Sequence, residues 1–193
     1  MTPATTAGDN ARTRASSVAE RQAPLRRVYE RDPEAAMIVD RGRTLGGGLD
    51  DPLHTSAAPG DEYPAKAVAI VVGTHRGVGG LHDRPNPGEL LCATLAACQD
   101  STVRMVANLL GIRITSLAVR VDGQVDLRGT LAVDRSVRVG FQSMRCRTQL
   151  GVGEGTDARA VQLLFAAAER SCVVLDTLRS GVAVASNFEV ITP

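Results

Sequence analysis

Aromatic residues are scarce in this chain. Its 193 residues include no tryptophan, two tyrosines and three phenylalanines, so the hydrophobic core must be built mainly from valine, leucine, isoleucine and alanine. Lysine is nearly absent as well: Lys66 is the only one, and arginine supplies almost all of the positive charge. The formal net charge of +1 at pH 7 provides no concentrated basic field, which argues against binding to nucleic acid.

Long hydrophobic runs are missing too. No apolar stretch reaches the ~20 residues that a helix needs to span a bilayer, and the N-terminus contains no apolar segment typical of a secretory signal. We therefore expect a cytoplasmic protein with no membrane partner. In a reducing compartment, the four cysteines serve as buried residues, metal ligands or reactive thiols rather than as a disulfide framework.

Motifs for metals and for common hydrolases are absent. His54, His75 and His82 are spread over loops without ligand spacing, and the sequence contains no C-x-x-C, so no metal ion is expected. Neither G-x-S-x-G, nor a Walker loop, nor H-E-x-x-H occurs. We therefore expect a protein without a cofactor.

The N-terminal residues differ from the rest of the chain. Residues 1–16 are rich in threonine, alanine and arginine without periodicity, which predicts disorder. Residues 17–31 predict a short amphipathic helix that Pro24 interrupts. The chain is therefore divided into a flexible or helical tail, residues 1–31, and one domain, residues 32–193.

The domain alternates between strand and helix patterns in the order β-β-α-β-β-α-β. A loop rich in glycine, aspartate and proline is predicted at 42–64. The order predicts an α+β fold with one long helix at its centre. Strands are predicted at 34–40, 65–73, 112–127, 131–150 and 182–191, and the second helix at about 157–179.

The central helix is the clearest element. Asn86 is a good N-cap, Pro87 suits the first helical position, and Glu89 falls at N3 to complete a capping box. The pattern continues to Leu110, where Gly111 supplies a stop. Because the first half of this helix is apolar on every side, we expect it to be buried.

The cysteines leave two interpretations open. Cys98 lies in the middle of the central helix, directly before the polar residues 99–102, and Cys172 lies on the apolar stripe of the second helix. Each is either a small buried hydrophobe or a thiol that borders a cavity. Cys92 lies about 240° around the helix from Cys98, which excludes a side-by-side pair. Cys146 falls in a strand and is interpreted as structural.

Three segments resemble one known family. PNPGELLCATLAACQDST resembles the central-helix motif of the OsmC/Ohr (organic hydroperoxide resistance) proteins, VDLRGTLAV with VGFQSM looks like a strand pair of one subgroup, and AERSCVVLDTL is similar to the second-helix motif. The match runs over about residues 33–190. It implies an OsmC-like domain in an intertwined homodimer, with long buried central helices packed against curved antiparallel sheets.

The resemblance also implies a chemistry. Active members of the family reduce organic hydroperoxides; Cys98 matches their peroxidatic cysteine, Cys172 their resolving cysteine, and an external dithiol resets the pair. The arginine that activates the thiolate is matched by Arg43, with Arg41 as its substitute. Glu89 corresponds to the glutamate that orients this arginine. The sequence thus suggests a thiol-dependent peroxidase with no metal and no cofactor.

One departure from the family pattern keeps other functions open. Gly88 occupies the position that directly follows the motif's proline, and Glu89 comes one residue later, rotated by about 100° around the helix. The capping role of Glu89 is therefore at least as good an interpretation as the catalytic one. The alternatives are a non-catalytic OsmC-like dimer that binds a small molecule, and a hydrolase or transferase with Cys98 as nucleophile.

Overall fold

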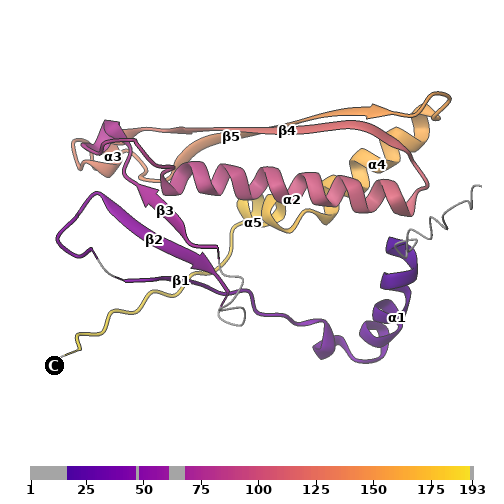
Figure 1. Ribbon diagram of the computed structural model, residues 1–193, viewed down its shortest axis with the longest axis horizontal. Coiled ribbons are helices and arrows are strands. Elements are labelled where there is room, and N and C mark those ends of the chain that lie inside the picture. The colour runs from indigo at the N-terminus through magenta and orange to yellow at the C-terminus, as the bar shows by residue number, and fades with distance from the viewer. Residues whose placement is uncertain (1–16, 47, 61–67, 192–193) are drawn as a thin grey trace, which may run out of the picture. The chain divides into compact units, whose positions relative to one another are not determined.

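A computed structural model gives the fold of residues 17–46, 48–60 and 68–191 (Figure 1). Contacts divide the chain into two compact units, residues 1–37 and 38–193. The predicted disorder of residues 1–16 lies outside the described residues.

The described part of the first unit, residues 17–37, is dominated by one α-helix. Helix α1, Val18–Arg31, begins with a capping box in which the Ser17 side chain accepts a hydrogen bond from the Glu20 N–H and the Glu20 carboxylate accepts one from the Ser17 N–H. The predicted helix is confirmed, but Pro24 lies within it and does not end it. Its missing N–H removes only one of the helix hydrogen bonds.

The predicted strand at 34–40 is wrong. Residues Pro33–Ala36 form the 3-10 helix η1, and residues 37–41 form no regular structure. Asp32 starts this turn because its side chain accepts a hydrogen bond from the Glu34 N–H, 3.2 Å away. Pro33 then fixes the backbone in a conformation that suits the first position of the turn.

The second unit begins with a small antiparallel sheet. Its order is β1 (Gly42–Thr44), β2 (His54–Pro59) and β3 (Ile70–Gly73). β3 confirms the predicted strand 65–73 from Ile70 onward; residues 68 and 69 form no strand, and residues 65–67 lie outside the described residues. β1 and β2 correct the predicted loop at 42–64. These strands are short and rich in glycine, alanine and proline, so they carry little of the alternation that identifies a strand.

The central helix is confirmed. α2, Pro87–Leu109, has Asn86 as its N-cap and a complete capping box with Glu89. Figure 1 shows the long hairpin of β4 (Ile114–Val125) and β5 (Phe141–Val152) running along this helix.

The hairpin is shorter than the sequence predicted. The predicted strand at 131–150 is wrong in its first half, because residues 131–140 form turns and β5 begins only at Phe141. The preceding residues form the short helix α3, Leu127–Thr130, which Asp126 caps through the Arg128 N–H. The three-residue 3-10 helix η2, Arg76–Val78, connects β3 to α2.

The second predicted helix is two helices. α4, Ala158–Ser171, ends at Cys172, and α5, Val173–Ser180, begins directly after it. Cys172 has an extended backbone, with φ −82° and ψ 102°. The two β-branched valines that follow it reduce helix propensity at this point.

The core lies where α2 and α4 meet under the hairpin. Its buried side chains come from both helices, and residues of the hairpin pack against them. The α+β fold with antiparallel sheets and a long central helix is therefore confirmed. The buried residues of this cluster are Val103, Val106, Ala107, Leu164 and Ala168.

The C-terminal prediction is wrong for the single chain. Residues 182–191 pair with no strand of the described part of the molecule. They nevertheless carry the alternating apolar residues that predicted a strand, and these side chains are strongly exposed: Val184 at 82%, Phe188 at 93% and Val190 at 90%. A strand needs a neighbour for its hydrogen bonds, so the segment lacks the partner that would define it.

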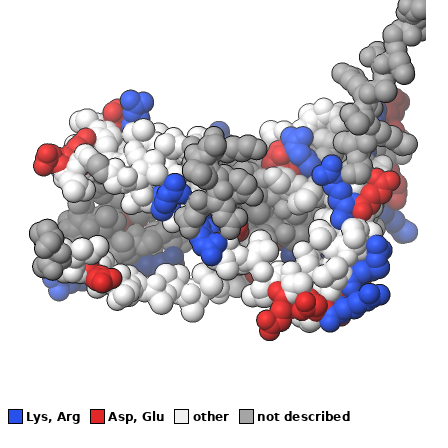
Figure 2. Space-filling model, turned by 60° about the horizontal axis from the view of Figure 1, so that its bottom comes forward, with Lys and Arg blue, Asp and Glu red and all other residues white. Residues whose placement is uncertain are grey.

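Charged side chains are interspersed on the face that Figure 2 shows. Blue and red groups alternate there with wide uncharged areas, and no large basic field stands out on that face. Within the described residues, no helix is both long and apolar enough to cross a bilayer.

Candidate functional site

The Cys172 thiol lies at the junction between α4 and α5. Its residue is fully buried, with 0% of its surface exposed, and it is the N-cap of α5. The Cys98 thiol, from the middle of α2, is close enough to Cys172 to act on its pKa. The structure therefore brings together the two cysteines that the sequence placed on separate helices.

The surroundings of Cys172 favour the neutral thiol. Burial raises its pKa above the ordinary value, and the neighbouring Cys98 and Cys146 thiols act in the same direction. The Leu175 N–H lowers this pKa, although the thiol forms no regular N-cap hydrogen bond with α5. A thiol that is neutral at pH 7 is a poor first nucleophile, because the thiolate is the reactive form. Such a thiol is better suited to the second step of a two-thiol reaction.

Polar residues follow Cys98 directly along α2. Cys98 is partly exposed, and its carbonyl accepts a hydrogen bond from the Thr102 hydroxyl at 2.7 Å. Gln99 is only 9% exposed, and its Oε1 atom has no hydrogen-bond partner in the described part of the chain. A buried polar atom without a partner is costly, so this acceptor needs an explanation.

Cys146 is a third thiol of this region. Alternation along β5 places it on the same face as Met144, Thr148 and Leu150, all partly buried. Burial raises the pKa of Cys146, and Arg179 lowers it. The sequence interpretation treated Cys146 as structural, although the alternation that directs it inward could have been read from the sequence.

A cavity of about 730 Å³ has Cys146 in its wall, whereas Cys98 and Cys172 are not among the residues that line it. Its walls come from α2, β5, α4 and α5, and Gln99 and Cys146 both line it. The Arg179 guanidinium donates to the Glu169 carboxylate, 2.5 Å away, in this wall. Most other lining residues are apolar: Leu91, Leu95, Phe141, Met144, Phe165, Leu175 and Leu178.

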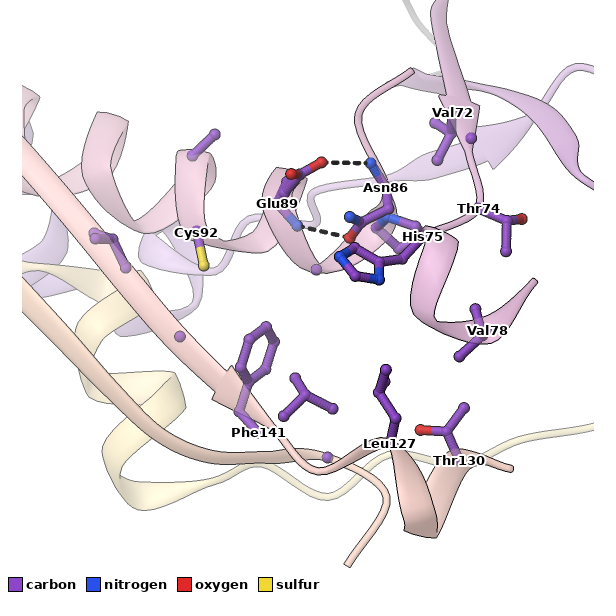
Figure 3. A pocket seen from close by; sticks show the side chains of 18 of the residues that line it. Val72, Thr74, His75, Val78, Asn86, Glu89, Cys92, Leu127, Thr130 and Phe141 are labelled. Atoms are coloured by element: carbon purple, nitrogen blue, oxygen red, sulfur yellow. Dashed lines mark hydrogen bonds between the residues drawn. The ribbon is translucent and has the colours of Figure 1, made fainter. Parts of the chain in front are cut away.

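Glu89 lies at the other end of α2, where it caps the helix (Figure 3). Its carboxylate accepts a hydrogen bond from the Asn86 N–H at 2.9 Å and lies 3.3 Å from His82. The hydrogen bond from Asn86 lowers the pKa of Glu89, and the nearby His82 adds to this effect. Nine helical positions, a rise of about 13.5 Å, separate Glu89 from Cys98.

Arg43 lies on the three-stranded sheet. Its guanidinium donates to the Gly60 carbonyl, whereas Cys98 lies in α2 against α5. Within one chain, Cys98 thus lies near Cys172. Glu89 and Arg43 lie in other parts of the fold.

A second and larger cavity, of about 1180 Å³, lies beside the start of α2. Figure 3 shows Cys92 and Phe141 facing it from the helix and the hairpin, with Val72 and Leu127 on other sides. Burial raises the pKa of Cys92, and the Asp122 and Glu89 carboxylates add to this. No group of three or more metal-ligating side chains occurs among the residues that the structure describes.

Two neighbouring thiols at the junction of packed helices define a candidate thiol site in an α+β fold. The family model of the OsmC-like proteins matches residues 80–187, more than half of the chain, and the chain belongs to this family. No curated protein matches the chain.

Solved structures agree with the family fold. An OsmC-like protein of unknown function from Vibrio cholerae is 10% identical and aligns with a TM-score of 0.58 over 73% of this chain and 94% of its own. An organic hydroperoxide resistance protein OsmC from Legionella pneumophila is 19% identical. It aligns with a TM-score of 0.53 over 74% of this chain and 90% of its own. An organic hydroperoxide resistance protein from Elizabethkingia anophelis is 18% identical. It aligns with a TM-score of 0.53 over 75% of this chain and 91% of its own. At such identities the likeness shows the fold alone.

Conservative replacement of Glu89 separates its two interpretations. Glutamine also completes a capping box, so if Glu89 serves only as a helix cap, Glu89→Gln should change any rate of peroxide reduction by no more than about twofold. Asn86→Ala, which removes the other half of the box, should cost about 1 kcal/mol of unfolding free energy and leave the reaction rate unchanged. Steady-state kinetics and denaturant unfolding measure the two effects. A loss of activity on the order of 100-fold in Glu89→Gln alone would assign Glu89 to catalysis.

Proposed function

We propose that the protein is a thiol-dependent peroxidase that reduces organic hydroperoxides with Cys98 and Cys172. The observation that carries the proposal is the proximity of these two thiols at the junction of α2 with α5. Membership of the OsmC-like family supports it. So do two proteins of the same fold, from Legionella pneumophila and Elizabethkingia anophelis, that are described as organic hydroperoxide resistance proteins.

The proposed reaction needs only thiols. The Cys98 thiolate attacks the terminal peroxide oxygen, the O–O bond breaks, and the alkoxide leaves as the alcohol after taking up a proton. Cys98 is then a sulfenic acid. The Cys172 thiol attacks its sulfur, water leaves, and a disulfide forms. An external dithiol reduces this disulfide and becomes a disulfide itself.

The burial of Cys172 suits its role as the resolving thiol. A neutral, shielded thiol does not compete with Cys98 for the peroxide, and it already lies next to the sulfur that it must attack. Cys98 is the more exposed of the two, as a first nucleophile must be. Arg43 is proposed to supply the positive charge that favours the Cys98 thiolate once the dimer forms.

A homodimer is part of the proposal. In one chain, the alternating apolar residues of 182–191 are exposed and unpaired, and Ile38 and Val39 are also exposed, at 75% and 69%. A second copy that pairs with these segments would bury both and supply their missing backbone partners. Such exchange of strands between copies is the arrangement that an intertwined dimer requires.

One equivalent of an alkyl hydroperoxide, added to fully reduced protein, tests the reaction. We expect mass spectrometry to find a Cys98–Cys172 disulfide within seconds, and a trapped Cys98 sulfenic acid in Cys172→Ser. Cys92→Ser is the matched control, because Cys92 lies on the same helix but lines the other cavity. If all four thiols stay reduced while the peroxide persists, the protein is not a peroxidase.

The raised pKa of Cys172 gives the resolving step a pH dependence. Its folded pKa lies above the ordinary 9.0, so the reactive thiolate is a minor form at neutral pH and its fraction grows as the pH rises. We expect the rate of disulfide formation from the Cys98 sulfenic acid to increase about tenfold per unit between pH 6 and 8. Rapid acid quenching followed by mass spectrometry measures this rate. A rate that is level over this range would place the effective pKa below 6 instead.

The larger cavity favours a second function, binding of a small molecule without chemistry. Its volume of about 1180 Å³ exceeds that of the cavity lined by Gln99 and Cys146, and it is lined by apolar residues together with a few polar ones, as ligand sites commonly are. A binding protein would retain ligand affinity in Cys98→Ser and Cys172→Ser and consume no peroxide. The same two variants therefore separate the functions.

A further inference from the structure

A histidine at the start of β2 lies between two carboxylates. His54 Nδ1 is 2.8 Å from Asp51 Oδ2, and His54 Nε2 is 2.9 Å from Asp83 Oδ1. A neutral imidazole has one N–H and can donate to one carboxylate, whereas an imidazolium donates from both nitrogens. Because a carboxylate oxygen can only accept, both contacts are hydrogen bonds only when the ring is protonated. The cluster is therefore complete while His54 carries a positive charge.

The cluster joins two segments that are far apart in the sequence. Asp51 belongs to the turn before β2, and Asp83 belongs to the loop that leads into α2. This loop is fixed on both sides of Asp83, because residues 82 and 85 are hydrogen-bonded to the backbone at the end of β3. The turn before β2 is held by the contact of Asp51 with His54 and by the Thr74 hydroxyl, which donates to the Leu53 carbonyl at 2.9 Å.

The same turn forms part of the wall of the larger cavity. Pro52, Leu53 and His54 line this cavity, and Cys92 lines it from α2. The His54 side chain is 23% exposed, so it lies between the cavity and the solvent-accessible carboxylates, which are about half exposed. A displacement of the turn therefore changes access to the cavity and to the Cys92 thiol.

The charges around His54 favour the imidazolium. The Asp83 carboxylate raises the pKa of His54 above its ordinary value of 6.5, and Asp51 adds to this. His54 in turn lowers the pKa of Asp83, and Arg84 acts in the same direction. From β3, the residue opposite His54 is the uncharged Gly73. Because the pKa of His54 is raised on folding, the cluster stabilises the fold fully below the ordinary pKa, and this contribution is lost as the pH rises through the folded pKa.

We propose that Asp51, His54 and Asp83 form a proton-operated latch on the larger cavity. While His54 is charged, the latch holds the turn before β2 against the loop before α2. When His54 loses its proton, one ring nitrogen presents a lone pair to a carboxylate, and that contact becomes repulsive. The turn with Asp51 then moves away, since the loop with Asp83 is fixed, and the cavity opens. None of these residues takes part in the proposed peroxide chemistry.

NMR of the histidine rings tests the charge state. We expect the His54 ring to titrate with a midpoint above 6.5, and this midpoint should fall in Asp51→Asn and in Asp83→Asn. Asp50→Asn is the matched control, because it removes the same charge from the same turn, whereas it is Asp51 that contacts the ring. A wild-type midpoint at or below 6.5, or an equal fall in Asp50→Asn, would overturn the latch.

Methyl relaxation of leucine tests the movement. Leu53 lies in the turn, so the order parameter of its methyl axis should fall as the pH rises through the His54 midpoint. The order parameter of Leu164, which is fully buried in the core, should stay constant. His54→Gln does not titrate and has donors at only one end of its side-chain amide, so its Leu53 order parameter should be low at every pH. A wild-type value that does not change with pH contradicts the movement.

Alkylation of Cys92 tests whether this movement opens the cavity. Below the His54 midpoint, iodoacetamide should modify Cys92 roughly threefold faster in His54→Gln than in the wild type, the size expected when a surface ion pair is lost. Above the midpoint the two rates should converge. Each comparison is made at one pH, and Cys98, which does not line this cavity, is the internal reference. Equal rates for Cys92 below the midpoint would mean that the cluster does not control the cavity, and the proposal would be abandoned.

Discussion

Cys98→Ser is expected to lose at least about 1,000-fold in the rate of hydroperoxide reduction. A serine hydroxyl is almost wholly protonated at neutral pH and is a poor nucleophile toward an O–O bond, whereas a thiolate is a strong one. Removal of a nucleophile commonly costs several orders of magnitude. The consumption of an alkyl hydroperoxide, followed with a dithiol reductant in excess, measures the loss. The fold should persist, because the substitution is nearly isosteric.

The other cysteines provide the comparison. Cys92→Ser should retain full activity, since Cys92 lines a different cavity. Cys172→Ser should still react once with peroxide but turn over slowly, because the Cys98 sulfenic acid lacks its neighbouring thiol. Full activity in Cys98→Ser would remove Cys98 from the reaction and would direct attention to Cys146, which lines the smaller cavity near Arg179.

Elements with complete local signals could be predicted from the sequence. The central helix carries its own start, with Asn86, Pro87 and Glu89, and it begins where these residues indicated. The boundary at Cys172 could not be predicted, because the apolar stripe of the second helix continues across it. Residue Cys172 is the C-cap of α4 and the N-cap of α5, with an extended backbone. That conformation depends on tertiary packing, which overrides a helical pattern.

The strands could not be predicted from local alternation alone. The alternation at 182–191 is as good as that of the hairpin, yet no strand forms there in the single chain. β1 and β2 form from residues with hardly any alternation, because β2 pairs with β3 and β1 pairs with β2. A strand is defined by its neighbour, and a sequence pattern identifies the segment but not its partner.

The candidate site could also be predicted only in part. The sequence singled out Cys98 and Cys172, but only the fold brings their side chains together. Gln99 and Cys146 were not predicted as parts of one cavity, since they come from a helix and a strand far apart in the chain. For Gln99 the signal was present in part, as a polar residue that follows the apolar half of the central helix. Its unpaired oxygen is visible only in three dimensions.

Phe188→Asp is expected to weaken a homodimer of this chain about 100-fold. Phe188 is 93% exposed in the single chain, and in an extended strand it would share one face with Val182, Val184 and Val190. Burial of one large apolar side chain contributes roughly 1.5–3 kcal/mol, and a symmetric dimer loses this contribution twice. A loss of about 3 kcal/mol corresponds to slightly more than two powers of ten in the dissociation constant.

Asn187→Asp is the matched control for this substitution. It adds the same charge at the neighbouring position, whose side chain points to the opposite face of an extended strand. Sedimentation over a range of concentrations should show the dimer in the wild type and in Asn187→Asp, and a shift toward monomer in Phe188→Asp. If both variants dissociate equally, charge rather than a buried strand face controls the assembly. If the wild type is a monomer at every concentration, the exposed segment has another partner, and the proposed contribution of Arg43 from a dimer must be abandoned with it.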